Sequence, residues 1–130
     1  MRKIKRLLYL ILSLMLLSSC TPGGGSSNSY RSISMDEAVK MMKEEKNYII
    51  LDVRRPYEYA EGHIPGAINV PNENIGSAEI PELPDKAQLI LVYCRSGKRS
   101  KDASEKLAKL GYTNIVEFGG ILDWKGEIEK

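Results

Sequence analysis

The residue in this sequence best suited to chemistry is Cys94, which joins an apolar run to a short basic loop. The run at residues 89–93 predicts a buried strand, and a helix is predicted to open at Ser100. The carboxyl end of such a strand is where an open α/β sheet binds its ligand. Loop amides, the helix N-terminus and three cationic side chains would all stabilise an anion there. We therefore predict that Cys94 is a thiolate nucleophile and not a packed structural cysteine.

The six residues after Cys94 form the candidate binding loop for a small anion. Three are basic, one is glycine and two carry hydroxyl groups. A tight loop of this kind can turn successive backbone N–H groups inward, and its basic side chains attract anions. For Lys98 the alternative is a solvated surface charge. In order, the loop residues are Arg95, Ser96, Gly97, Lys98, Arg99 and Ser100.

The rest of the sequence predicts alternating strands and helices that would position this loop. Wholly apolar runs are typical of strands covered on both faces, and Ser34 begins a capping box that starts a helix. The predicted strands are residues 48–53, a brief one within 63–71, 89–93 and 115–118. The predicted helices start after Ser34, at Pro56 (ending at Gly62), at Ser100 (ending at Gly111) and around Trp124. This alternation predicts an α/β fold with a central parallel sheet flanked by helices on both faces.

Residues 1–19 predict a secretory leader, with a basic start and an apolar core that is too short to span a bilayer comfortably. The leader ends in Leu17-Ser18-Ser19-Cys20, which resembles the lipobox of a bacterial lipoprotein signal peptide. We expect Cys20 to be acylated, for example with palmitate, and to anchor the protein at the extracytoplasmic face of a bacterial membrane. The alternative is an ordinary cleaved signal peptide with an incidental cysteine.

The expected mature protein has a tether and one domain. Residues 20–31 hold the cysteine to be acylated and a stretch of Pro, Gly, Ser and Asn that predicts a flexible tether. Residues 32–130 then form a single domain of ordinary size.

Charge and cysteine content exclude several classes of function. The whole chain has a net charge of +2, but four of its 19 bases lie in the leader, which leaves 15 bases against 17 acids. The sequence therefore gives no indication of nucleic-acid binding. Two cysteines, Cys20 and Cys94, are too few for a disulfide framework or a thiolate zinc site.

Four segments of the chain, between Ser34 and about Gly126, resemble the rhodanese-like sulfurtransferase family in the order in which they occur. The segments are Leu51-Asp52-Val53-Arg54 with Pro56 and Glu58, then Gly62-His63-Ile64-Pro65-Gly66-Ala67-Ile68-Asn69, then Cys94-Arg95-Ser96-Gly97-Lys98-Arg99-Ser100, and Gly119-Gly120-Ile121 with Trp124. The resemblance implies a single domain with a central parallel sheet. It also implies that Cys94 takes a sulfane sulfur from thiosulfate or a related donor, becomes a persulfide, and passes the sulfur to cyanide or a thiol. No metal or organic cofactor is expected.

The loop residues suit this implied reaction. Arg95, Lys98 and Arg99 can attract a small anionic sulfur donor, while the amides of residues 95–100 hold first the thiolate and then the outer persulfide sulfur. A covalent enzyme form predicts ping-pong kinetics. The expected partners are the donor, a thiol or cyanide acceptor and the membrane that holds the anchor, and we expect a monomer.

Two other functions compete with this one. Cysteine phosphatases and arsenate reductases place five residues between the cysteine and a clamping arginine, whereas four separate Cys94 from Arg99 and Ser100 stands at the phosphatase position. The smaller loop favours a single sulfur over a phosphate. A persulfide carrier or binding module of the same fold, without notable turnover, is the second alternative, because a fold does not fix function.

Four further residues are candidates for supporting the site. Asp52 and Arg54 end a buried strand, and the resemblance favours a buried pair that fixes the loops. His63 lies among turn-forming residues, which favours a structural role over that of a general base. Some thiosulfate-specific relatives carry arginine at the position of Glu58 and lysine at that of Ser96, so these two residues leave the identity of the donor open.

Overall fold

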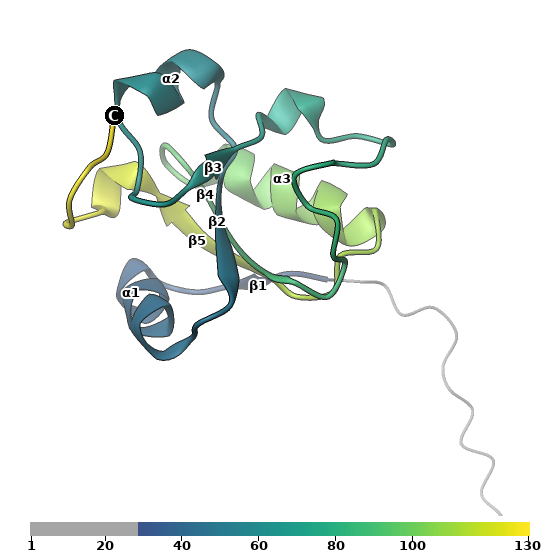
Figure 1. Cartoon of the computed structure of the whole chain (residues 1–130), viewed down its shortest axis with the longest axis horizontal. Helices are drawn as coiled ribbons and strands as arrows, with labels where there is room; N and C mark the ends of the chain where they lie inside the picture. Colours follow the sequence, from purple (N-terminus) through teal and green to yellow (C-terminus); the bar gives the residue numbers. More distant parts are fainter. Residues whose placement is uncertain (1–28) are drawn as a thin grey trace, which may run out of the picture.

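The computed structural model describes residues 29–130, which fold around a parallel five-stranded sheet (Figure 1). The strands lie in the order β1-β5-β4-β2-β3, and every neighbouring pair is parallel. The three central strands are largely buried, as their apolar runs predict. The bounds are β1 Arg31–Ser32, β2 Tyr48–Asp52, β3 Ile68–Asn69, β4 Leu89–Cys94 and β5 Ile115–Gly120. The predicted leader, Cys20 and the tether as far as residue 28 lie outside the described residues.

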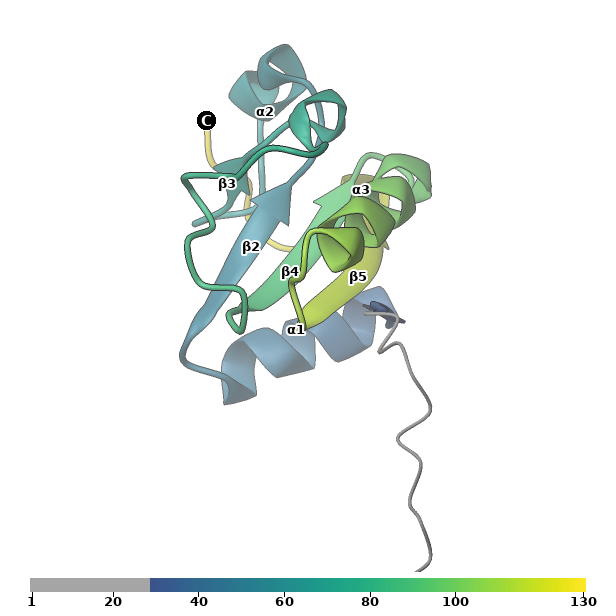
Figure 2. The same cartoon turned by 90° about the vertical axis from the view of Figure 1, so that its right-hand side faces the viewer.

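Helices cover both faces of the sheet, which confirms the predicted fold class (Figure 2). The helix α3 packs on one face, over Leu51, Val92 and Ile115, and α1 packs on the other, over Ile50 and Leu91. Successive residues of a strand point to opposite faces, so each central strand contributes to both cores. The helices are α1 Met35–Glu44, α2 Pro56–Glu61 and α3 Lys98–Lys109, with 3-10 turns η1 Asn72–Asn74 and η2 Ile121–Asp123. Within residues 29–130, no helix is long and apolar enough to cross a membrane.

The helix starts follow from local sequence chemistry. The Ser34 hydroxyl accepts a hydrogen bond from the Glu37 amide, and the Glu37 carboxylate accepts one from the Ser34 amide, so the predicted capping box is present. Pro56 occupies the first turn of α2, where its missing N–H costs no hydrogen bond, and Gly62 ends that helix.

One predicted helix start and one predicted helix are wrong, each because of tertiary contacts. The helix α3 begins at Lys98 and not at Ser100, because Gly97 adopts a φ of 110° and serves as the N-cap. The predicted terminal helix around Trp124 is absent: η2 ends at Asp123, and the chain after it is irregular, with a bend at Gly126. The backbone of Glu129 exchanges two hydrogen bonds of 2.9 Å with His63, and this pairing holds the C-terminal segment against the loop that follows α2.

A buried ion pair fixes the loops at the carboxyl edge of the sheet. The Arg54 guanidinium donates to both carboxylate oxygens of Asp52, at 2.7 to 3.1 Å, and to the carbonyl of Gly62 at 2.7 Å. Asp52 is fully buried and also accepts from the Tyr93 hydroxyl at 2.6 Å. The Tyr93 oxygen in turn accepts from the Ile64 amide, so the network ties β2 and β4 to the chain after α2. Burial and the hydrogen bond to Asp52 raise the pKa of the Tyr93 phenol.

Replacing Asp52 by asparagine should destabilise the protein strongly. The substitution keeps the size of the side chain but leaves the Arg54 charge buried without a counter-ion, and we expect a loss of about 3 kcal/mol or more in the free energy of unfolding. Urea unfolding checks the value. The exposed pair between Lys40 and Glu44 is the control, because Glu44→Gln should cost less than about 0.5 kcal/mol. A loss for Asp52→Asn as small as that of the control would contradict the structural role.

Candidate active site

Cys94 is the last residue of β4, at the carboxyl edge of the sheet and between β5 and β2. Its side chain points to the face that α3 covers and is 1% exposed. The pairing of β4 with β5 shifts in register between Val92 and Cys94, so that Cys94 faces Gly120. The thiol therefore lies under the loop that joins β4 to α3, at the edge where open α/β sheets bind ligands.

The backbone conformation of Gly97 directs an amide of the loop toward the sulfur. Its N–H donates to Sγ of Cys94 at 3.0 Å, and its φ of 110° is a conformation that side chains rarely allow. Because Gly97 is also the N-cap of α3, the N-terminus of that helix lies beside the same sulfur. Of the loop amides from Arg95 to Ser100, the one with a hydrogen bond to the resting thiol is that of Gly97.

Two glycines at the end of β5 make room for this loop. A Cβ on Gly120 would overlap the carbonyl of Arg95, and a Cβ on Gly97 would lie 3.5 Å from Cα of Gly119. The backbones of the loop and of β5 are therefore in direct contact, which a side chain at residue 120 would prevent. This contact explains why the Gly119-Gly120 segment lies against the cysteine loop, although Gly119 follows Cys94 by 25 positions in the sequence.

Ser100 and Glu117 lie directly beneath Cys94. The Ser100 hydroxyl is 3.4 Å from Sγ and 2.6 Å from Oε1 of Glu117. Both residues are buried, at 0% and 2% exposed. The sequence analysis included Ser100 but missed Glu117, although a carboxylate inside the apolar run at residues 115–118 could have revealed it.

Arg99 and Glu58 form an ion pair at the rim of the site. The guanidinium of Arg99 donates to both carboxylate oxygens of Glu58, at 2.7 and 2.9 Å. This hydrogen bond lowers the pKa of Glu58 to about 2, although partial burial opposes the shift. The pair neutralises the charge of Arg99, which the sequence analysis expected to attract an anionic sulfur donor. Arg95, Ser96 and Lys98 are exposed.

The other predicted supporting residues form no hydrogen bond with the thiol. His63 stacks on Tyr59, with ring centroids 3.8 Å apart, and its Nδ1 is 2.9 Å from the Tyr59 carbonyl oxygen. Its Nε2 is 3.4 Å from the Glu129 carboxylate. Together with the pair of Asp52 and Arg54 described above, His63 holds the loops around α2 in place.

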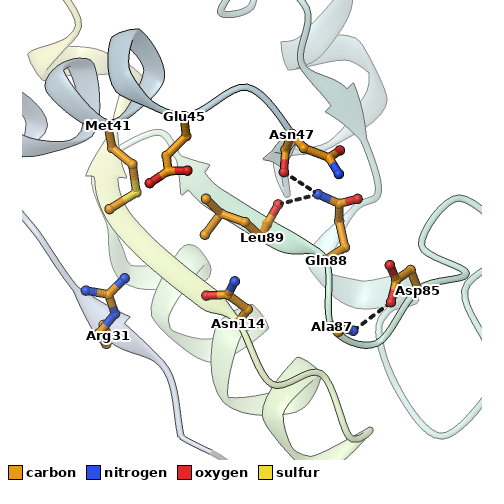
Figure 3. Close-up of a pocket in the computed structure, with 9 residues that line it drawn as sticks. All are labelled: Arg31, Met41, Glu45, Asn47, Asp85, Ala87, Gln88, Leu89 and Asn114. Carbon is orange, nitrogen blue, oxygen red and sulfur yellow. Dashed lines mark hydrogen bonds between the residues drawn. The ribbon is translucent and has the colours of Figure 1, made fainter.

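A polar hollow occurs at the opposite edge of the sheet, where β1 and β4 begin and where residues precede β2 and β5 (Figure 3). Its amide groups bond to one another: Nε2 of Gln88 donates to the carbonyl of Asn47 at 2.8 Å. It contains no thiol or imidazole, and within residues 29–130 no group of three or more His, Cys, Asp or Glu side chains could hold a metal ion. The hollow is lined by Arg31, Met41, Glu45, Asn47, Asp85, Ala87, Gln88, Leu89 and Asn114.

Comparison with known proteins agrees with this geometry. The model of the rhodanese-like domain family matches residues 34–127. The chain is 38% identical over 73 residues to thiosulfate sulfurtransferase PspE of Escherichia coli, covering 56% of this chain and 70% of that protein. It is 32% identical over 111 residues to the thiosulfate:glutathione sulfurtransferase of Saccharomyces cerevisiae, covering 75% and 79%. A rhodanese-like domain protein of Staphylococcus aureus has a similar solved structure, with a TM-score of 0.63, 32% identity and coverage of 76% and 96%.

Replacing Glu58 by glutamine should give a stability difference that depends on pH. The pKa of Glu58 is lowered in the folded protein from 4.5 to about 2, so its stabilising effect is complete above about pH 5 and is lost as the pH falls toward 2. The difference from wild type should reach at most about 3 kcal/mol near neutral pH. Urea unfolding at a series of pH values measures it, with Glu44→Gln as the exposed control. A difference that stays constant down to the acid limit would be inconsistent with the ion pair.

Proposed function

The chain belongs to the rhodanese-like domain family, and on that basis we propose that it is a sulfurtransferase that carries sulfane sulfur on Cys94. The proposal is supported by the hydrogen bond from the Gly97 amide to Sγ at the N-terminus of α3, because a backbone donor and a helix N-terminus favour a negative charge on sulfur. The relatives named as thiosulfate sulfurtransferases act on the donor class proposed for this protein.

The proposed reaction has two sulfur transfers. The Cys94 thiolate attacks the outer sulfur of thiosulfate, the sulfur–sulfur bond of the donor breaks, and sulfite leaves with the electron pair. Cyanide or a thiolate then attacks the outer sulfur of the Cys94 persulfide, and the cysteine thiolate departs. The charge stays on sulfur in both steps, so the Gly97 amide and the positive end of α3 stabilise it throughout.

The geometry disfavours the phosphatase alternative. A cysteine phosphatase needs an arginine that is free to clamp the phosphate, and Arg99 is bound to Glu58 through both carboxylate oxygens. Ser100, at the position of the phosphatase arginine, is buried against Glu117. Neither residue offers a free cation to a tetrahedral oxyanion.

The ion pair between Arg99 and Glu58 also affects which sulfur donor the site would attract. With Arg99 neutralised by Glu58, the attraction for a thiosulfate dianion comes from Arg95 and Lys98, both exposed and therefore screened by salt. A persulfide donor carries one negative charge where thiosulfate carries two, so it depends less on this attraction. Polysulfide is, like thiosulfate, a small sulfane-sulfur anion. We propose a donor class of sulfane-sulfur anions, with thiosulfate as one member.

The chemistry can be tested by mass measurement with the full chain carrying Cys20→Ser, so that Cys94 is its only thiol. Thiosulfate or polysulfide should add the mass of one sulfur atom, and cyanide should remove it with release of thiocyanate. Cys94→Ser should abolish the gain while its thermal unfolding stays unchanged. Repeated turnover supports an enzyme, and a single round of loading and release supports the carrier. No mass gain from either donor would refute the assignment.

We also propose that acylation of Cys20 holds this domain, as a monomer, at the extracytoplasmic face of a bacterial membrane. The leader-like composition of residues 1–19 and the four residues ending in Cys20 support the proposal.

Labelling of bacteria with palmitate tests the anchor. The wild-type chain should carry the label and sediment with membranes, because one cysteine-linked lipid group transfers many methylenes into the bilayer. Cys20→Ser should carry no label, whereas Cys94→Ser is the matched control and should keep it. Label on the Cys20→Ser chain, or none on the wild type, would contradict the proposal.

A further inference from the structure

Glu117 is a buried carboxylate that the proposed sulfur transfer does not use. It lies on β5, on the same face of the sheet as Cys94, and is 2% exposed. Its Oε1 accepts hydrogen bonds from the Gly119 amide at 2.8 Å and the Ser100 hydroxyl at 2.6 Å, and its Oε2 accepts from the Ser32 hydroxyl at 3.1 Å. None of the ion pairs in the described part of the chain includes it.

A buried carboxylate without a cation is costly, because hydrogen bonds alone replace its hydration. The alternating pattern of β5 would place an apolar side chain at residue 117, under α3, as it does at Ile115. The position of Glu117 therefore calls for a chemical role, and its nearest reactive neighbour is Cys94, reached through Ser100.

Ser100 links the two acids. Its hydroxyl has one proton and several acceptors: Oε1 of Glu117 at 2.6 Å, the Gly97 carbonyl at 2.9 Å and the Gly119 carbonyl at 3.3 Å. When Glu117 is ionised, it is the charged and closest acceptor, so the Ser100 hydroxyl donates its hydrogen bond to Glu117. The Ser100 oxygen then presents a lone pair to Cys94, 3.4 Å from Sγ, and can accept the thiol proton.

We propose that Glu117 shares one proton with Cys94 through Ser100 and thereby determines the pH at which the thiolate forms. In one form the thiol keeps its proton and Glu117 is ionised. In the other, the S–H bond breaks and the proton passes to the Ser100 oxygen, while the Ser100 proton passes to Oε1 of Glu117. The pair carries one negative charge in both forms, so no other reactant is needed. The inference rests on the proposed function only in that Cys94 is the nucleophile.

Other charged groups around Cys94 come from three places. Arg99 on α3 is the nearest paired cation: its pKa is raised first by its hydrogen bond to Glu58 of α2, and the charge of Cys94 adds to that shift. Arg95 in the loop and Lys98 at the start of α3 are exposed. These four charged groups are the same in the wild-type protein and in a Glu117 variant. A comparison of the two proteins therefore measures the effect of Glu117 on the thiolate.

The test is the rate at which iodoacetamide alkylates Cys94 as a function of pH, in the full chain carrying Cys20→Ser. The wild-type rate should rise in two steps, because two coupled acids titrate together. Glu117→Gln keeps an acceptor for Ser100 and Gly119 and a donor for Ser32, but it cannot take a proton. Its rate should rise in one step, about one pH unit or more below the upper wild-type step, which is a gain of about tenfold in thiolate at a fixed lower pH.

Two further variants make the result decisive. Ser100→Ala keeps both acids but removes the hydroxyl that, in the second form, donates to the thiolate and accepts from protonated Glu117, so the lower step should shrink while the upper step stays. Asp102→Asn removes a carboxylate on α3 that instead bonds to Asn72 and Lys106, and its profile should match the wild type. Should Glu117→Gln fail to fold, the Ser100→Ala profile carries the test.

Identical profiles for the wild type and Glu117→Gln would overturn the proposal, and so would a lower step of undiminished height in Ser100→Ala. A purely structural role for Glu117 would change the rate at every pH without moving the steps. Alkylation does not require sulfur transfer, so this outcome is independent of the mass measurement that tests the proposed function.

Discussion

The hydrogen bond from the Gly97 amide to the Cys94 sulfur is the contact on which this site depends. It forms because Gly97 adopts a positive φ. The same residue is the N-cap of α3, so one glycine places both a backbone N–H and a helix N-terminus beside the thiol. The sulfur is buried at the same time, so these dipoles act on it with little competition from water.

The sheet supplies the rigidity that this hydrogen bond needs. The strand β4 lies between β5 and β2: Tyr93 pairs with Asp52 of β2, and Cys94 pairs with Gly120 of β5. Gly120 allows β5 to approach the Arg95 carbonyl, so the loop is in contact with a strand and not with solvent on that side. Asp52 and Arg54 perform a related task on the β2 side, where they connect the strand ends to the segment after α2.

Charge at the site is arranged in two layers. At the rim, Glu58 neutralises Arg99, so the strongest fixed cation of the loop serves to join α2 to α3. Beneath the sulfur, Glu117 adds a buried negative charge, linked to the thiol through Ser100. The Gly97 amide and the N-terminus of α3 therefore face the same sulfur as the hydrogen-bonded pair of Ser100 and Glu117.

The sequence alone was sufficient for the fold class and for the three central strands. Apolar runs, the capping box at Ser34 and the basic loop after Cys94 depend on local pattern, and each predicts its element directly. The early start of α3 and the irregular C-terminal segment were decided by tertiary contacts: a left-handed Gly97 against β5, and Glu129 paired with His63. The partners of Arg99 and Ser100 were likewise beyond sequence analysis. Glu58 lies 41 residues from Arg99, and Glu117 lies 17 from Ser100, so only the folded sheet brings these charges together.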